Sequence, residues 1–154
     1  MSDGTTTNPF ENPDFYRKNT EKNFLEKHLN SIKNLQKQII GAFFELIELQ
    51  EEYETISRET ESQERIKKIW AKSKEIEKKK DSIRDLIDKI NNGSKLFYNL
   101  LHERDSQITI PQLEIENREI VSFFADISDK NGQGIIKKIN DYVLALRAIS
   151  DSMN

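Results

Sequence analysis

The residues of this sequence best suited to acid–base or metal chemistry near neutral pH are two histidines, His28 and His102, among many carboxylates. A di-iron carboxylate site in a helical bundle needs a glutamate three residues before its histidine ligand. Leu25 and Asn99 occupy those positions. The absence of cysteine excludes disulfides, zinc fingers and thiol catalysis. We therefore predict a protein that is not an enzyme, with no metal and no cofactor, and with both histidines at the surface or at the edge of a helix seam.

Two segments have features of phosphate binding, but neither has the full pattern. Asn131-Gly-Gln-Gly134 lacks the following Lys-Ser/Thr and the preceding strand of a phosphate loop, so it predicts a connection between helices. The lysine-rich segment 65–80 contains one aromatic residue, Trp70, whereas single-strand binders interleave several. The net charge of −3 also lacks the basic excess of nucleic-acid binders, so we expect no nucleic-acid partner.

Composition favours elongated helices with thin apolar seams. Of the 154 residues, 35% are hydrophobic and 33% are charged. The length suits one domain, which we place at residues 13–154 behind a flexible polar tail at residues 1–12. No stretch approaches the roughly 18 apolar residues of a membrane span. The tail also lacks the apolar run of a signal peptide, so we expect a cytoplasmic protein.

Apolar residues recur at alternating steps of four and three, which is the rhythm of a coiled coil. The first seam is Leu25, Leu29, Ile32, Gln36, Ile39, Phe43, Leu46, Gln50 and Tyr53. The second seam has a different phase and is Ile66, Ile69, Ser73, Ile76, Lys80, Ile83, Ile87, Ile90, Ser94, Phe97 and Leu101.

The change of phase has two explanations: a turn near residue 60 that reverses the chain, or one continuous helix with a local change of supercoil. Residues 45–64 carry eight glutamates and one arginine, whereas residues 65–80 carry eight lysines or arginines and two glutamates. A hairpin would bring the acidic flank onto the basic one, and we favour it for that reason. The lack of glycine or proline between the seams argues against a turn.

The predicted fold class is all-α: an elongated antiparallel helical hairpin, coiled-coil-like, with two shorter C-terminal helices packing alongside in a four-helix arrangement. We expect the short helices to line the hairpin end to end. The core should lie at residues 39–49, where a second apolar stripe adjoins the first seam. The helices are predicted at about 13–57, 63–104, 111–129 and 135–152.

Candidate partner-binding residues are Phe43, Phe44 and Ile47 in the wide apolar stripe, and Trp70, which lies beside the second seam. Tryptophan is a frequent anchor of protein interfaces. The alternative for Trp70 is packing against the hairpin partner or the short helices.

The tail contains Asn8-Pro9-Phe10. This tripeptide resembles the NPF motif that EH domains of endocytic and membrane-trafficking proteins bind, and the resemblance implies an EH-domain partner. The other interpretation is a turn whose Phe10 packs on the first helix.

The function predicted from these patterns is a non-enzymatic helical scaffold or adaptor subunit of a cytoplasmic complex, in membrane trafficking if the tail motif is used. Its partners would be other helical proteins or a second copy of the chain, since polar seam residues such as Gln50 select register and partner. The alternative is a membrane-associated module that binds anionic lipid through segment 65–80. A third class is an enzyme or small-molecule carrier whose pocket lies between the helices, in a cavity lined by Phe43, Phe44, Phe123 or Phe124.

Overall fold

The computed structural model describes residues 13–103, 110–122, 127–128 and 130–153. The described residues contain no strand, and the predicted all-α fold is confirmed. The N-terminal tail, with Asn8, Pro9 and Phe10, lies outside the described residues. The helices are α1 (Pro13–Ser57), α2 (Gln63–Glu103), α3 (Ile110–Val121) and α4 (Gly132–Ser152).

Burial follows the two predicted seams. The apolar seam residues of α1 are buried from Leu25 to Leu46, and those of α2 from Ile76 to Leu101. Towards the turn the seams become partly exposed, and Ile66 is 59% exposed. The heptad pattern therefore positions α1 against α2 as an antiparallel pair, with the deepest packing away from the turn.

The turn at residues 58–62 forms without glycine or proline because side chains satisfy the helix ends. The guanidinium of Arg65 donates to the carbonyl oxygens of Ile56 and Ser57, at 3.4 and 2.8 Å. The hydroxyl of Ser62 accepts a hydrogen bond from the backbone N–H of Arg65 at 3.1 Å, as an N-cap of α2. The hairpin predicted from the charge pattern is thus confirmed, and the structure adds the N-cap at Ser62 and the contacts of Arg65.

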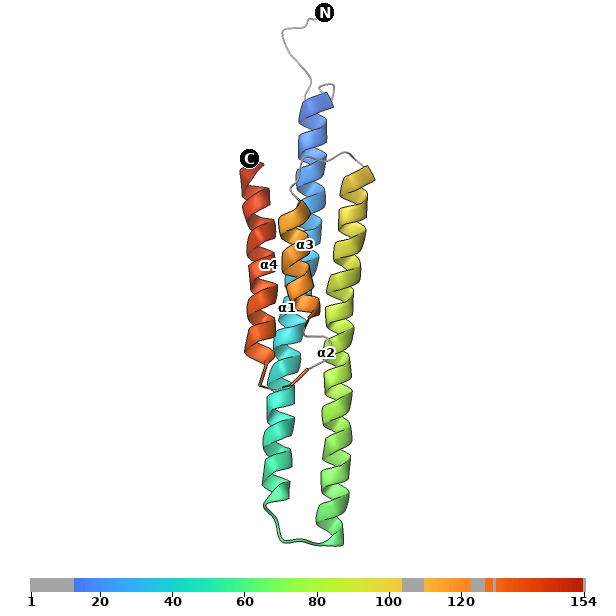
Figure 1. The fold of residues 1–154 in the computed structure, drawn as a ribbon, viewed down its shortest axis with the longest axis vertical. Helices are drawn as coiled ribbons and strands as arrows, with labels where there is room; N and C mark the ends of the chain where they lie inside the picture. Colours follow the sequence, from blue (N-terminus) through green and yellow to red (C-terminus); the bar gives the residue numbers. More distant parts are fainter. Residues whose placement is uncertain (1–12, 104–109, 123–126, 129, 154) are drawn as a thin grey trace, which may run out of the picture.

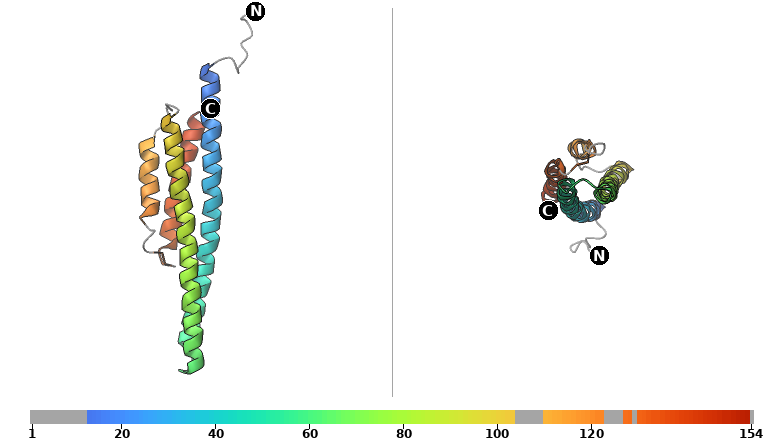
Figure 2. Two further views of the ribbon diagram at one scale, coloured as in Figure 1. Left: turned by 90° about the vertical axis from the view of Figure 1, so that its right-hand side faces the viewer. Right: turned by 90° about the horizontal axis from the view of Figure 1, so that it is seen from below.

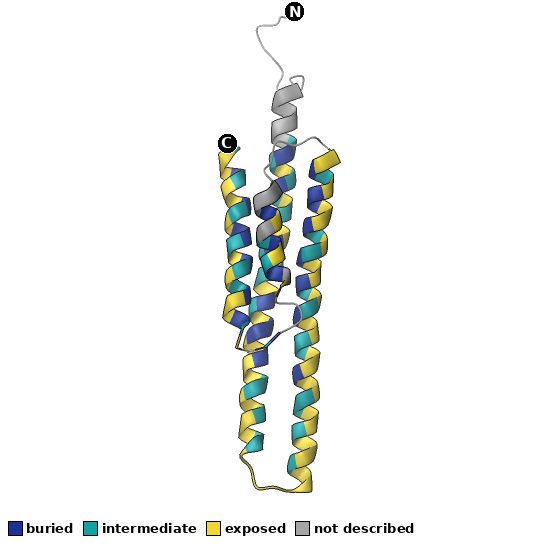
Figure 3. Cartoon of the chain, in the orientation of Figure 1, coloured by how far each residue is buried: buried dark blue, intermediate teal, exposed yellow. Residues whose placement is uncertain are grey.

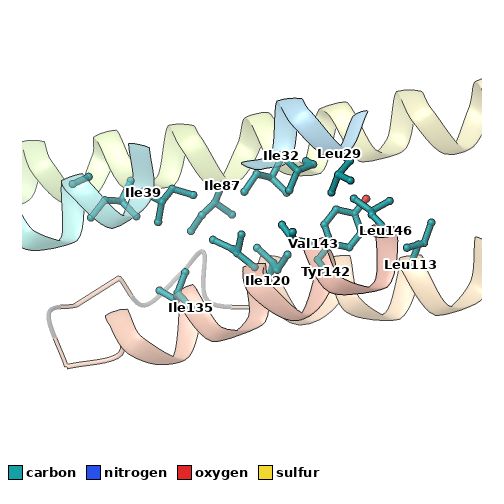
Figure 4. Packing of buried hydrophobic residues seen from close by; sticks show 14 of the residues in the cluster. Leu29, Ile32, Ile39, Ile87, Leu113, Ile120, Ile135, Tyr142, Val143 and Leu146 are labelled. Carbon is teal, nitrogen blue, oxygen red and sulfur yellow. The ribbon is translucent and has the colours of Figure 1, made fainter. Parts of the chain in front are cut away.

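The short helices convert one half of the hairpin into a four-helix bundle (Figures 1 and 2). α4 packs on α1, α3 packs on α2, and α3 and α4 pack on each other, so that the four helices form a ring of antiparallel neighbours. Its interior contains aliphatic residues of all four helices, among them Ile32, Ile87, Leu113 and Leu146 (Figure 4). The bundle lies at the end of the hairpin where α1 begins.

The remaining half of the hairpin extends beyond the bundle as two helices alone, and we call residues 44–80 the arm (Figures 1 and 3). α1 extends for about 20 Å past Phe43, at 1.5 Å per residue. Within the arm Leu46 and Ile76 are buried and the other residues are exposed or half-buried, whereas buried residues recur on all four helices of the bundle.

Two expectations, about the arrangement of the short helices and the end of α3, were wrong. α3 and α4 lie side by side and do not follow one another along the hairpin. α3 ends at Val121, not near residue 129, and Ile127 is buried outside any helix. Ile120 and Ile127 have helical spacing, which misled the prediction. The hydroxyl of Ser122 donates to a backbone carbonyl three residues before it, an alternative to continued helix.

α4 begins at Gly132, three residues earlier than predicted. Ser128 and Asn131 form a compact turn before it, in which each side chain accepts from the backbone N–H of the other at 3.3 and 3.0 Å. Because α4 starts opposite Phe43, the four-helix core lies mainly between Leu25 and Phe43. The prediction placed the core at residues 39–49, which is too close to the arm.

Gly132 is expected to be intolerant of a side chain. A Cβ atom at this position would lie 2.8 Å from Cδ1 of the buried Phe43 ring. We expect Gly132→Ala to lower the free energy of unfolding by about 1–3 kcal/mol because the ring must move in a packed core. Urea denaturation followed by circular dichroism would measure this.

Two other glycines provide the control. A Cβ atom at Gly41 or Gly93 would have no neighbour within 4 Å. Gly41→Ala and Gly93→Ala should each raise the free energy of unfolding by about 0.5–1 kcal/mol, the ordinary gain within a helix. Equal effects at all three positions would contradict the role of close packing at Gly132.

Candidate functional site

A chain of polar groups inside the bundle connects all four helices. The hydroxyl oxygen of Tyr142 (α4) lies 3.0 Å from Nε2 of His28 (α1), and 2.8 Å and 3.0 Å from the hydroxyls of Ser94 and Tyr98 (α2). Tyr98 donates its proton to the carbonyl oxygen of Leu113 (α3) at 3.0 Å. Each of the three hydroxyl-bearing residues is buried.

Only one arrangement of the hydroxyl and imidazole protons is compatible with these contacts. Tyr98 has one hydroxyl proton, which it donates to Leu113, so it can only accept from Tyr142. Tyr142 therefore donates to Tyr98, and Ser94 and His28 must both donate to Tyr142. The geometry thus requires a His28 ring that carries a proton on Nε2.

Burial keeps these groups uncharged. Desolvation lowers the pKa of His28 to about 4, and its ring stacks on Phe97 with centroids 4.2 Å apart. Burial also raises the pKa of Tyr98 and of Tyr142 above the usual tyrosine value. A neutral imidazole and two neutral phenols, joined by hydrogen bonds inside the bundle, fix the arrangement of the helices.

The two histidines lie in different surroundings. His28 is half-buried beside the seam residue Leu29, and His102 is exposed. The described residues contain no group of three or more acidic or histidine side chains that could hold a metal ion. Sequence patterns did not reveal the polar chain because its members come together only through packing of all four helices.

One edge of the arm is held by ion pairs between the helices. Glu45 pairs with Lys79, and the carboxylate of Glu52 lies 2.5 Å from Nζ of Lys72. Near the turn, Lys68 lies 3.7 Å from Glu59. This is the predicted contact of acidic and basic flanks. Exposed pairs of this kind contribute at most about 1 kcal/mol each.

The opposite edge of the arm exposes large apolar side chains, and we call it the arm face. Its members are Phe44, Ile47 and Trp70, which are 65%, 38% and 63% exposed. In an antiparallel coiled coil, each flank of one helix lies beside the corresponding flank of the other helix. The ion pairs occupy one pair of flanks, so the remaining pair forms the opposite edge of the arm. Ile66, at the end of its seam near the turn, is also 59% exposed.

Trp70 has a cation above its ring. The Nζ atom of Lys74, one turn further along α2, lies 3.6 Å from the ring centroid. Such a contact at an exposed site contributes about 0.5–1 kcal/mol. The ammonium group does not cover the indole, since the Trp70 side chain is still 63% exposed.

The structure separates the predicted partner-binding residues into two groups. Phe44, Ile47 and Trp70 lie on the arm face, and no other part of the described chain covers them. Phe43 is 2% exposed and lies against Gly132, so it belongs to the bundle core and not to the arm face. Phe43 lies on the seam, and the seam faces the bundle interior.

No family model, curated protein or solved structure matches this chain. Among the described helices, none combines the length and apolar character needed to cross a membrane.

Proposed function

We propose that this chain is a non-enzymatic helical scaffold or adaptor subunit, which binds another protein along the arm face in a cytoplasmic complex. The observation that carries the proposal is the exposure of Phe44, Ile47 and Trp70 along an arm that projects beyond its own bundle. Contiguous apolar side chains on a protein surface commonly mark interaction sites, and tryptophan is enriched among interface anchors.

The division of the chain into bundle and arm supports this role. Hydrogen bonds among the core polar groups join the four helices of the bundle. The arm is held by a seam with polar positions and by surface ion pairs. A rigid bundle that presents an apolar two-helix arm suits a subunit that positions a partner.

The alternative, binding of anionic lipid through segment 65–80, has less support. Lys68, Lys72 and Lys79 lie against glutamates of α1. Lysines neutralised within the chain contribute less to attraction by an anionic surface. Sedimentation with anionic liposomes would test it, and salt-sensitive binding would support the lipid alternative.

A role in membrane trafficking rests on Asn8, Pro9 and Phe10 alone. Titration of a peptide of residues 1–15 onto an EH domain would test it. Absence of binding at millimolar concentration would reject this part of the proposal and leave the arm face unaffected.

Site-specific photo-crosslinking would test the central proposal. A photoreactive residue placed at Phe44 or Ile47, in cells that produce the protein, should yield an adduct of defined mass. The same residue placed at Leu96 or Leu144, which are exposed apolar positions of the bundle, should not. Adducts of equal yield at all four positions, or none at the arm, would reject the arm face as the binding surface.

A further inference from the structure

The arm face continues the side of the hairpin that α3 and α4 cover in the bundle. Glu26 of α1 contacts Ser150 of α4 at 3.5 Å, and Asn91 of α2 accepts from Asn117 of α3 at 3.1 Å. Ile47 follows Glu26 by three heptads, and Trp70 precedes Asn91 by three heptads. Residues separated by whole heptads lie on the same side of a coiled coil.

α3 and α4 therefore cover this side of the hairpin in the bundle and leave it uncovered in the arm. α4 starts opposite Phe43, immediately before Phe44 and Ile47. Half-burial of Ile40, two heptads after Glu26, marks the edge of the covered region. A helix laid on the arm face would continue the packing of the bundle.

Charges border the arm face with opposite signs. Glu51 and Glu54 follow Phe44 and Ile47 by one heptad on α1, and both are exposed. Lys67 and Lys74 lie within one turn of Trp70 on α2 and are also exposed. Further from the turn, Glu77 is paired with Lys80 within α2. The arm face thus has an acidic border along α1 and a basic border along α2.

A second copy of the chain fits this surface poorly. If the two-fold axis ran along the arm, the α3–α4 pairs of both copies would occupy the same space (Figure 2). If the axis ran across the arm, α1 would face α1 and α2 would face α2. Glu51 and Glu54 would then meet carboxylates, and Lys67 and Lys74 would meet ammonium groups, which is unfavourable.

We infer that the occupant of the arm face is one amphipathic helix of a different protein, with an apolar stripe, a basic flank and an acidic flank. It lies along the arm between α1 and α2, with its basic flank beside Glu51 and Glu54. The 20 Å length of α1 in the arm corresponds to about 14 residues of partner helix. If the bound helix is reversed in direction with its apolar stripe still on the arm face, its two flanks exchange sides. The acidic border along α1 and the basic border along α2 therefore also determine the direction in which the helix binds. This inference rests on the proposed function and specifies its partner.

Three synthetic helices of about 18 residues would test it. They share one apolar stripe and lack tryptophan; one has a lysine flank and a glutamate flank, one has lysine on both flanks, and one has glutamate on both. Trp70 is the single tryptophan of the chain, so its emission reports binding at the arm face. We expect the mixed-flank peptide to bind at least about tenfold more tightly than the other two at low ionic strength.

Charge reversal and apolar variants complete the test. In Glu51→Lys/Glu54→Lys both borders are basic, and preference should change to the peptide with two glutamate flanks. Phe44→Asp/Ile47→Asp should abolish binding of all three peptides, while the bundle variant Leu144→Asp should not affect it. Light scattering should give the mass of a monomer for the purified chain.

The outcomes separate the two proposals. Equal affinity for all three peptides, lost in Phe44→Asp/Ile47→Asp, would overturn the charge rule and leave helix binding at the arm face in place. Crosslinks from Phe44 without binding of any peptide would overturn a single-helix partner alone. A dimer that Phe44→Asp dissociates would identify a second copy as the occupant and overturn the inference. Neither peptide binding nor crosslinks would overturn both.

Discussion

Replacement of Tyr142 by alanine is expected to lower the free energy of unfolding by about 3–5 kcal/mol. Tyr142 is fully buried, and its hydroxyl joins groups from α1 and α2 to the helix α4 that carries it. Truncation removes a large ring from the core and leaves the hydroxyl of Ser94 and the Nε2 proton of His28 without their acceptor. Chemical denaturation with circular dichroism would measure the loss.

Tyr142→Phe separates the ring from the hydroxyl. It retains the packing and removes the shared oxygen, so we expect a loss of about 1–3 kcal/mol from the buried groups that lose a partner. Ser94→Ala in the Tyr142→Phe background should then cost less than in the wild type, because the two groups interact. Additive effects of the two substitutions would show that the hydroxyl network does not stabilise the bundle.

Acidification is expected to destabilise the protein through His28. Its pKa is about 4 in the folded chain and 6.5 in the unfolded chain. Above pH 6.5 both states are neutral at this residue, and stability is unaffected. Between pH 6.5 and about 4 the unfolded chain binds a proton that the folded chain does not, so the free energy of unfolding decreases as the pH falls. The full decrease is about 3 kcal/mol, and it levels off below pH 4.

His28→Gln is the matched variant, because a glutamine amide can donate to Tyr142 and does not titrate. Carboxylates also titrate below pH 5, so the relevant quantity is the stability of the wild type minus that of the variant. This difference should decrease by about 3 kcal/mol from pH 7 to pH 4. The corresponding difference between the wild type and His102→Gln, a substitution at an exposed position, should not show this decrease. Parallel stability curves for the wild type and His28→Gln would contradict the buried, neutral histidine.

The hairpin and its seams could be predicted from sequence because they depend on local periodicity. Steps of four and three residues placed Ile39 and Ile87 in the core, and charge asymmetry indicated the turn near residue 60. Glu52 and Lys72 show the same logic, since complementary flanks meet when the chain reverses. Each of these inferences uses residues of one helix or of two neighbouring helices.

The placement of the short helices could not be predicted in this way. Ile127 keeps the apolar spacing of α3 and is buried, but it lies beyond the end of the helix. Apolar spacing thus predicted its burial correctly and its secondary structure wrongly. Heptad spacing puts Phe43 in the seam and predicts its burial, but the exposure of Phe44 beside the seam depends on where α4 begins. That position is set by a turn whose geometry hydrophobic periodicity does not encode.

Because the arm consists of two helices only, its local unfolding should differ from that of the bundle. Its seam includes Gln50 and Ser73, and fewer apolar residues are buried there than in the bundle. Local stability should therefore decrease from the bundle towards the turn, and the arm can fray while the bundle stays folded. Amide hydrogen exchange in the arm would then be faster, and a bound helix would slow it by selecting the closed form. Affinity at the arm face would accordingly depend on how often the arm is closed, so that substitutions inside its seam could tune binding without touching the partner.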